Sequence, residues 1–158
     1  MTTEYGNALQ IMLVEDNPAD ITLVRLALQA AGLDCRLQVI ENGEQAIAFI
    51  GALDADAKAI PIDMLLLDLH LPRQDGDVIL QCLRATKSCA RTPVVVMTAS
   101  DAPQDREISQ KYAALHYFRK PASLDRFMEL GMIVSRIVSR KSADNESAGR
   151  RKALGGAA

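Results

Sequence analysis

The chain has 158 residues, of which 49% are hydrophobic, and its 18 Lys and Arg nearly balance 20 Asp and Glu. A chain of this length folds as one compact domain that buries about two thirds of its unfolded surface, so its core requires neither disulfide nor metal. The formal net charge of −2 argues against nucleic-acid binding through bulk charge, because phosphate contacts require clustered Lys and Arg.

Cysteine usage and hydropathy point to an intracellular protein. Cys35, Cys82 and Cys89 form neither an even set nor a Cys-x-x-Cys pair, which is typical of free thiols in a reducing cytosol. The longest apolar run is five residues, 46–50, whereas a bilayer span requires about 18. No basic-then-apolar signal segment begins the chain. We therefore expect a cytoplasmic protein with no membrane segment.

Five short apolar runs alternate with longer helical patterns. Three runs are continuously apolar, as in strands that are covered on both faces of a parallel sheet. In the second run Cys35, Leu37 and Val39 alternate with Arg36 and Gln38, which predicts an exposed edge strand. The five predicted strands cover residues 10–14, 35–40, 63–69, 93–98 and 114–118.

The first three helical patterns have readable boundaries. Asn17 and Pro18 provide an N-cap and a first-turn proline, and Gly32 can end that helix. Asn42 begins the second helix, and Gly76 precedes the third. Strands and helices in this alternation, joined by right-handed crossovers, predict an α/β fold with a doubly wound five-stranded parallel sheet.

The last two helical patterns are less regular. The fourth, over 103–112, has Ile108 almost alone as an apolar anchor, so we expect it to shift at little cost. The fifth begins at Ser123 and contains Gly131, which costs about 1 kcal/mol relative to Ala. We expect residues 1–9 to be flexible, 10–139 to form the domain, and the polar residues 140–158 to be a disordered, solvated tail.

Polar residues follow the strands at one edge of the predicted sheet, where ligands of doubly wound folds bind. Glu15 and Asp16 follow the first strand, and Asp68 lies near the end of the third. Thr98 ends the fourth strand, and Lys120 follows the fifth. Three carboxylates this close repel one another and raise their own pKa values unless a cation lies among them. Oxygen ligands without His or Cys favour Mg²⁺.

This constellation suits phosphoryl chemistry. A carboxylate beside a metal can attack phosphorus and form an acyl phosphate, and the central third strand makes Asp68 the candidate nucleophile. Lys120 supplies positive charge for phosphoryl oxygens, and the Thr98 hydroxyl can donate to one of them. Ala99 leaves the approach to Asp68 open.

Five segments carry these residues in a distinctive order. Thirty residues separate Asp68 from Thr98, and twenty-two separate Thr98 from Lys120. In this order the segments resemble the response-regulator receiver domain of two-component signalling, over roughly residues 10–139. The segments are Glu15-Asp16-Asn17-Pro18, Asp68-Leu69-His70-Leu71-Pro72, Asp75-Gly76, Thr98-Ala99 and Tyr117-Phe118-Arg119-Lys120-Pro121.

The resemblance implies a flavodoxin-like three-layer sandwich with strand order 2-1-3-4-5. It also implies phosphoryl transfer to Asp68 from a sensor histidine kinase or a histidine phosphotransfer protein. Mg²⁺ would bind Glu15, Asp16, Asp68 and the backbone carbonyl of His70, partly through water. Such a protein is a signalling module rather than an enzyme, because it catalyses only its own phosphorylation and dephosphorylation.

Thr98 and Tyr117 match the family's switch pair, although an aromatic residue at position 117 is more often part of the core. Phosphorylation would bias the face formed by the fourth helix, fifth strand and fifth helix. A domain that ends near residue 139 leaves no room for an effector, so we expect an unidentified downstream protein, and no DNA, as the output. Both a monomer and a homodimer through this face remain open.

The stretch 51–62 is longer than usual before a third strand. Together with residues 17–20 and 120–127, it resembles stand-alone regulators that accompany phytochrome-type and other sensor kinases. An alternative class is the haloacid-dehalogenase phosphatase, which also forms an aspartyl phosphate. That class requires its nucleophile on the first strand and an Asp two residues later, where this chain has His70. A flavodoxin-like ligand module would require a Ser/Thr/Gly-rich phosphate loop after the first strand, which here is acidic.

Overall fold

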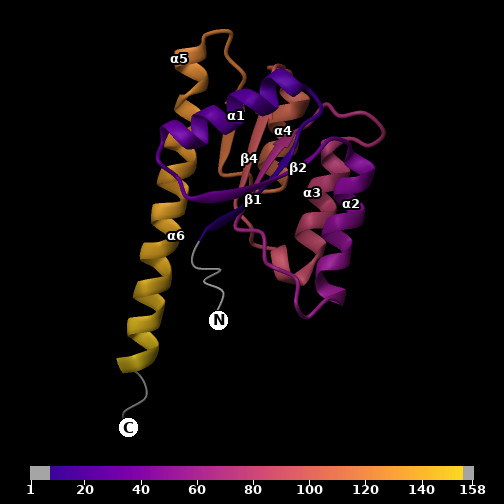
Figure 1. The fold of residues 1–158 in the computed structure, drawn as a ribbon. Coiled ribbons are helices and arrows are strands. Elements are labelled where there is room, and N and C mark those ends of the chain that lie inside the picture. Colours follow the sequence, from indigo (N-terminus) through magenta and orange to yellow (C-terminus); the bar gives the residue numbers. More distant parts are fainter. Residues whose placement is uncertain (1–7, 155–158) are drawn as a thin grey trace, which may run out of the picture.

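The computed structural model describes residues 8–154. Its sheet has five parallel strands in the order β2-β1-β3-β4-β5, which confirms the predicted topology (Figure 1). β2 lies at the edge and shows the predicted alternation, whereas every residue of β3 and β4 is buried. The strands are β1 (Leu9–Val14), β2 (Cys35–Ile40), β3 (Met64–Asp68), β4 (Val94–Thr98) and β5 (His116–Arg119).

Helices cover both faces of the sheet (Figure 1). One apolar cluster joins the sheet to α2, α3 and part of α4, and a second joins it to α1, α5 and α6. No helix within residues 8–154 is long and apolar enough to cross a membrane. The helices are α1 (Pro18–Ala30), α2 (Gly43–Ala52), α3 (Gly76–Ala85), α4 (Pro103–Lys111), α5 (Leu124–Phe127) and α6 (Glu129–Leu154), with 3₁₀ turns η1 (Leu53–Ala55) and η2 (Lys87–Cys89).

The predicted helix boundaries rest on identifiable caps. The side-chain oxygen of Asn17 accepts a hydrogen bond from the Ala19 amide at 2.9 Å, and that of Asn42 accepts one from Gln45 at 2.9 Å. Gly32 has φ +68° just after α1, a left-handed conformation that glycine adopts without steric penalty. These caps determine where the chain turns back toward the sheet.

The register aligns the carboxyl ends of the strands. Val14 pairs with Leu67, and Asp68 pairs with Met97. Thr98 pairs with Arg119. Residues that directly follow β1 and β5, and those that end β3 and β4, therefore meet at one edge of the sheet.

The segment 51–62 is attached to the α3–β4 connection. α2 continues to Ala52, and η1 follows it directly. The carboxylate of Asp54 accepts hydrogen bonds from the amides of Lys87 at 2.8 Å and Ser88 at 2.9 Å. The additional residues thus lie at the opposite end of the sheet from the strand ends described above.

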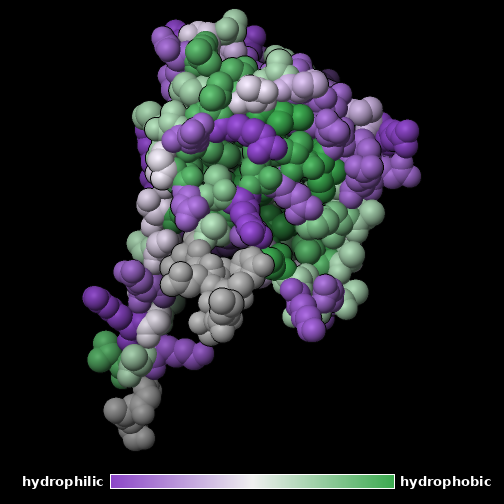
Figure 2. All heavy atoms as spheres, viewed as in Figure 1, coloured by the Kyte–Doolittle hydropathy of each residue, from purple (hydrophilic) through white to green (hydrophobic). Residues whose placement is uncertain are grey.

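The C-terminal prediction is wrong for the part of it that the structure describes. A turn at Met128 divides the predicted fifth helix into α5 and α6, and α6 continues to Leu154 where a disordered tail was expected. Residues 140–154 contain no Pro, and their three Ala, three Arg and two Lys favour helix, whereas their Ser, Asp, Asn and Gly favour it less. Opposite charges four residues apart, such as Glu146 and Arg150, add support. This part of α6 extends past the sheet (Figure 1) and is largely hydrophilic (Figure 2).

Predictions for the extreme termini lie partly outside the described residues. Residues 1–7 and 155–158 are not described. Leu9, expected in a flexible N-terminus, instead belongs to β1 and pairs with Cys35.

Gly131 has a packing role that propensity alone does not reveal. A Cβ atom on Gly131 would overlap the carbonyl oxygen of Ala27 and press on Ala31. The missing side chain therefore allows α6 to approach α1 closely, and this contact offsets the propensity cost of glycine within a helix.

Replacing Gly131 with alanine should lower the free energy of unfolding by about 1–3 kcal/mol, because α1 and α6 must separate to admit the methyl group. Urea denaturation measures the change. Gly149→Ala is the matched control, since a Cβ there meets nothing within 4 Å; it should leave stability unchanged or raise it by up to about 1 kcal/mol. Equal stability of the two variants would contradict this role for Gly131.

Candidate functional site

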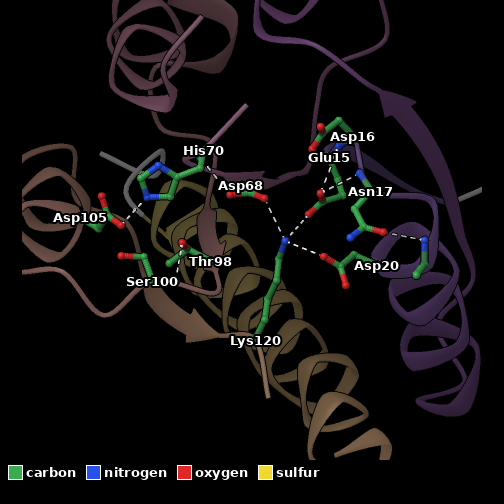
Figure 3. Close-up of polar contacts among 11 residues, drawn as sticks. Glu15, Asp16, Asn17, Asp20, Asp68, His70, Thr98, Ser100, Asp105 and Lys120 are labelled. Atoms are coloured by element: carbon green, nitrogen blue, oxygen red, sulfur yellow. Dashed lines mark hydrogen bonds and ion pairs between the residues drawn. The ribbon is translucent and has the colours of Figure 1, made fainter. Parts of the chain in front are cut away.

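The ammonium group of Lys120 lies at the centre of a carboxylate cluster (Figure 3). Its Nζ is 2.6 Å from Glu15 Oε2, 2.8 Å from Asp20 Oδ2 and 2.9 Å from Asp68 Oδ2. The Lys120 amide donates to the Thr98 carbonyl at 2.8 Å, which fixes the start of the side chain. Burial alone would lower the pKa of Lys120, but hydrogen bonds to the three carboxylates raise it above its usual value. Lys120 is therefore positively charged at neutral pH.

Glu15 is fully buried at the end of β1. Its Oε1 accepts hydrogen bonds from the amides of Asp16 and Asn17, both at 3.1 Å. Burial raises the pKa of Glu15, and the charge of Asp68 adds to this, while Lys120 and the Asn17 amide oppose it. Sequence reasoning predicted a raised pKa from repulsion among carboxylates, whereas desolvation is the larger cause.

Three carboxylates form a potential metal site. Glu15, Asp16 and Asp68 each present an oxygen, and these atoms lie within 4.8 Å of one another. Asp16 is exposed, and its carboxylate makes no hydrogen bond or ion pair with any described residue. Three carboxylates, Glu15, Asp20 and Asp68, contact the single ammonium of Lys120, and Asp16 adds a fourth negative charge beside Glu15 and Asp68. Excess negative charge and an all-oxygen donor set fit a hard divalent cation such as Mg²⁺.

Asp68 ends β3 with both carboxylate oxygens engaged. Oδ2 accepts from Lys120, and Oδ1 accepts from the His70 amide at 2.9 Å. The side chain is 11% exposed, so a small part of it remains accessible. The His70 imidazole turns away from the carboxylate cluster, and its Nε2 lies 2.7 Å from Asp105 Oδ2 on α4 (Figure 3).

Thr98 and Tyr117 contact the same loop residue. The buried Thr98 hydroxyl accepts from the Ser100 amide at 3.1 Å, and the Tyr117 hydroxyl donates to the Ser100 carbonyl at 2.8 Å. The Arg106 guanidinium lies 4.5 Å from the centre of the Tyr117 ring. A movement of the loop at Ser100 would therefore alter the contacts of Thr98 and Tyr117, and through Arg106 those of α4.

The structure gathers Glu15, Asp16, Asp68 and Lys120 as the sequence predicted, and it places Thr98 at the end of the neighbouring β4 with Ala99 directly after it. Sequence reasoning did not assign Asp20 or Asp105 to the site. The sequence did indicate Asp20, because it lies in the first turn of the helix that follows Glu15 and Asp16. Nothing in the sequence indicated Asp105, because its contact with His70 spans 35 residues.

The sequence also matches a known family model. Residues 11–130 match the response regulator receiver domain. The chain belongs to this family. As a receiver domain it has the family's parallel sheet of order 2-1-3-4-5, and it is a protein of two-component signalling rather than a haloacid-dehalogenase phosphatase.

Relatives of this receiver domain include characterised regulators. Response regulator Rcp1 of Synechocystis is 32% identical over 124 residues, which cover 78% of this chain and 84% of Rcp1. The crystal structure of the phosphorylated cyanobacterial phytochrome response regulator RcpA matches with TM-score 0.72 and 30% identity, covering 81% of this chain and 91% of RcpA.

A third relative contains a metal ion. The receiver domain of the sensor histidine kinase PA1611 from Pseudomonas aeruginosa has magnesium coordinated in its active-site cleft. It matches with TM-score 0.65 and 28% identity, and the alignment covers 82% of this chain and 97% of that domain.

Magnesium should stabilise the protein through its acidic cluster. At a free Mg²⁺ concentration ten times the dissociation constant, mass action raises the free energy of unfolding by about 1.4 kcal/mol. Asp16→Asn should weaken Mg²⁺ binding strongly, because it removes the one carboxylate of the cluster that the protein does not otherwise engage. Calorimetric titration and thermal unfolding measure both effects. Asp144→Asn, on the exposed end of α6, is the charge-matched control; equal loss in both variants would contradict the assignment.

Proposed function

We propose that Asp68 accepts a phosphoryl group from a histidine kinase or a histidine phosphotransfer protein. The observation that carries this proposal is the Lys120 ammonium, which contacts Asp68 at 2.9 Å beside a cluster of carboxylates suited to a divalent metal. A nucleophilic carboxylate, a fixed cation and a metal site in one place are what phosphoryl transfer to an aspartate requires.

Mg²⁺ would be held by Glu15, Asp16, Asp68 and the backbone carbonyl of His70. When bound, it supplies positive charge to the phosphoryl oxygens. An oxygen of Asp68 attacks the phosphorus of the phosphohistidine. A P–O bond forms as the P–N bond breaks, and the leaving imidazole nitrogen retains the electron pair and takes a proton from water. The product is an acyl phosphate on Asp68.

Lys120, Thr98 and Ala99 serve the transferred group. Lys120 is 9% exposed and already charged, so it can neutralise a phosphoryl oxygen with little rearrangement. The Thr98 hydroxyl donates to another oxygen once the group is present, and the small Ala99 leaves space for it. Lys120 then moves part of its hydrogen bonding from the Asp68 carboxylate to an oxygen of the phosphoryl group.

The output of this reaction is a change in protein docking. The buried residues of α4 are both polar, Asp105 and Ser109, so little apolar burial opposes a movement of this helix. When the Thr98 hydroxyl turns toward the phosphoryl group, the loop at Ser100 moves, and Tyr117 turns inward with it. The face formed by α4, β5 and α5 then binds a downstream protein or a second copy of the chain.

In this proposal, the sensor that phosphorylates Asp68 is of the phytochrome type. Similarity to RcpA, a cyanobacterial phytochrome response regulator, supports this sensor type. The protein acts in the cytoplasm. Catalysis by the protein is confined to its own phosphorylation and dephosphorylation.

Incubation with Mg²⁺ and a small phosphoryl donor should produce an acid-stable, base-labile phosphate on Asp68, located by mass spectrometry. Asp68→Asn should abolish the label, because an amide is a poor nucleophile, whereas Asp144→Asn should leave it unchanged. Label that persists in Asp68→Asn, or steady turnover of diverse phosphate esters, would refute the proposal.

Phosphorylation should alter amide hydrogen exchange in α4. The change should shrink in Thr98→Ala, although that variant still accepts phosphate, because the hydroxyl that senses the phosphoryl group is gone. Thr92→Ala, a buried threonine before the opposite end of β4, is the matched control and should behave as the unmodified protein does. If amide hydrogen exchange in residues 103–112 does not change on phosphorylation, the proposed switch through Thr98 and α4 is excluded.

A further inference from the structure

Asp105 on α4 is a buried carboxylate with no role in the reaction described above. Its side chain is 7% exposed, and its Oδ2 lies 2.7 Å from Nε2 of His70, in the loop after β3. Burying a carboxylate is unfavourable unless it is hydrogen-bonded. The N-terminal end of the helix dipole favours an acidic residue in the first turn, and the Asp105 carboxylate in addition points to the imidazole (Figure 3).

His70 is the residue through which Asp105 reaches the acceptor. The His70 amide donates to Asp68 Oδ1 at 2.9 Å, while its ring contacts α4. One residue is thus bonded through its backbone to the phosphoryl acceptor and through its side chain to the helix.

Packing does not determine where the imidazole lies. The His70 side chain is 61% exposed, and among the described residues Asp105 provides the only hydrogen bond to the ring. Without that bond, rotation about the side-chain torsions would let the ring swing toward Asp68. Because Asp68 is only 11% exposed, a ring in that position would cover much of its remaining access.

We propose that Asp105 is a positioning residue of the phosphoryl site, which holds the His70 imidazole against α4 and thereby keeps the approach to Asp68 open. The inference rests on the proposed function of Asp68 as acceptor. The ring has two arrangements: held against α4, which leaves Asp68 open, or swung toward Asp68, which covers it. One hydrogen bond to Asp105 raises the population of the first relative to the second by about two- to tenfold.

The test is the initial rate at which the full-length protein is labelled by a small acyl phosphate with Mg²⁺. Asp105→Ala and the better-filling Asp105→Leu, which both lack an acceptor, should label about two- to tenfold more slowly. Asp105→Asn should label at nearly the original rate, because its amide oxygen still accepts from Nε2. Ser109→Ala is the control for disturbance of α4, since Ser109 is also buried on this helix but forms no hydrogen bond with the His70 ring.

A second background separates positioning from general structural damage. In His70→Ala there is no ring to swing, so adding Asp105→Ala should not slow labelling further. Equal slowing by Asp105→Ala in both backgrounds, or normal labelling in Asp105→Ala and Asp105→Leu, would overturn the inference while leaving Asp68 as the acceptor. Absence of label in the unmodified protein would instead refute the proposed function, and this inference with it.

Discussion

The contact of one lysine with several carboxylates is the interaction on which the site depends. Glu15 lies at the end of β1 and Asp68 at the end of β3, where apolar strands surround them and water is scarce. Lys120, which follows β5, contacts both and also Asp20. Without this cation two buried negative charges would face each other unpaired, which is strongly unfavourable. The ammonium therefore joins the carboxyl ends of β1, β3 and β5 into one site.

The same arrangement explains why the site suits a divalent metal and a phosphoryl group. One ammonium does not neutralise the four nearby carboxylates, so negative charge remains, most accessibly at the exposed Asp16. A divalent cation supplies the missing charge and keeps room in its coordination shell for phosphoryl oxygens. Family membership and the magnesium in the related PA1611 receiver domain agree with this chemistry.

The surroundings of the site differ in how firmly they are held. β3 and β4 are buried throughout, and α1 is held to α6 by the close approach at Gly131. α4 instead buries Asp105 and Ser109 and is tied to the site by polar contacts, through His70 on one side and through Arg106 and Tyr117 on the other. Polar contacts can exchange partners at little cost, whereas a packed apolar interface cannot. The fold thus links α4, a helix held largely by polar contacts, through His70 to Asp68, the proposed phosphoryl acceptor.

By itself the sequence determined the strand pattern, the edge position of β2, the caps Asn17 and Asn42, and the meeting of Glu15, Asp16, Asp68 and Lys120. Each follows from local periodicity, or from the rule that parallel strands end at the same edge. Tertiary structure alone decided the rest: the role of Asp20, the pairing of Asp105 with His70, the need for glycine at 131 and the helical course of residues 140–154. The first three depend on contacts between segments far apart in the chain; a local pattern placed Asp20 near Glu15 and Asp16 but did not encode its contact with Lys120. The last arises because α6 is already nucleated by its packing against α1, so residues of modest helix propensity continue it instead of starting a helix of their own.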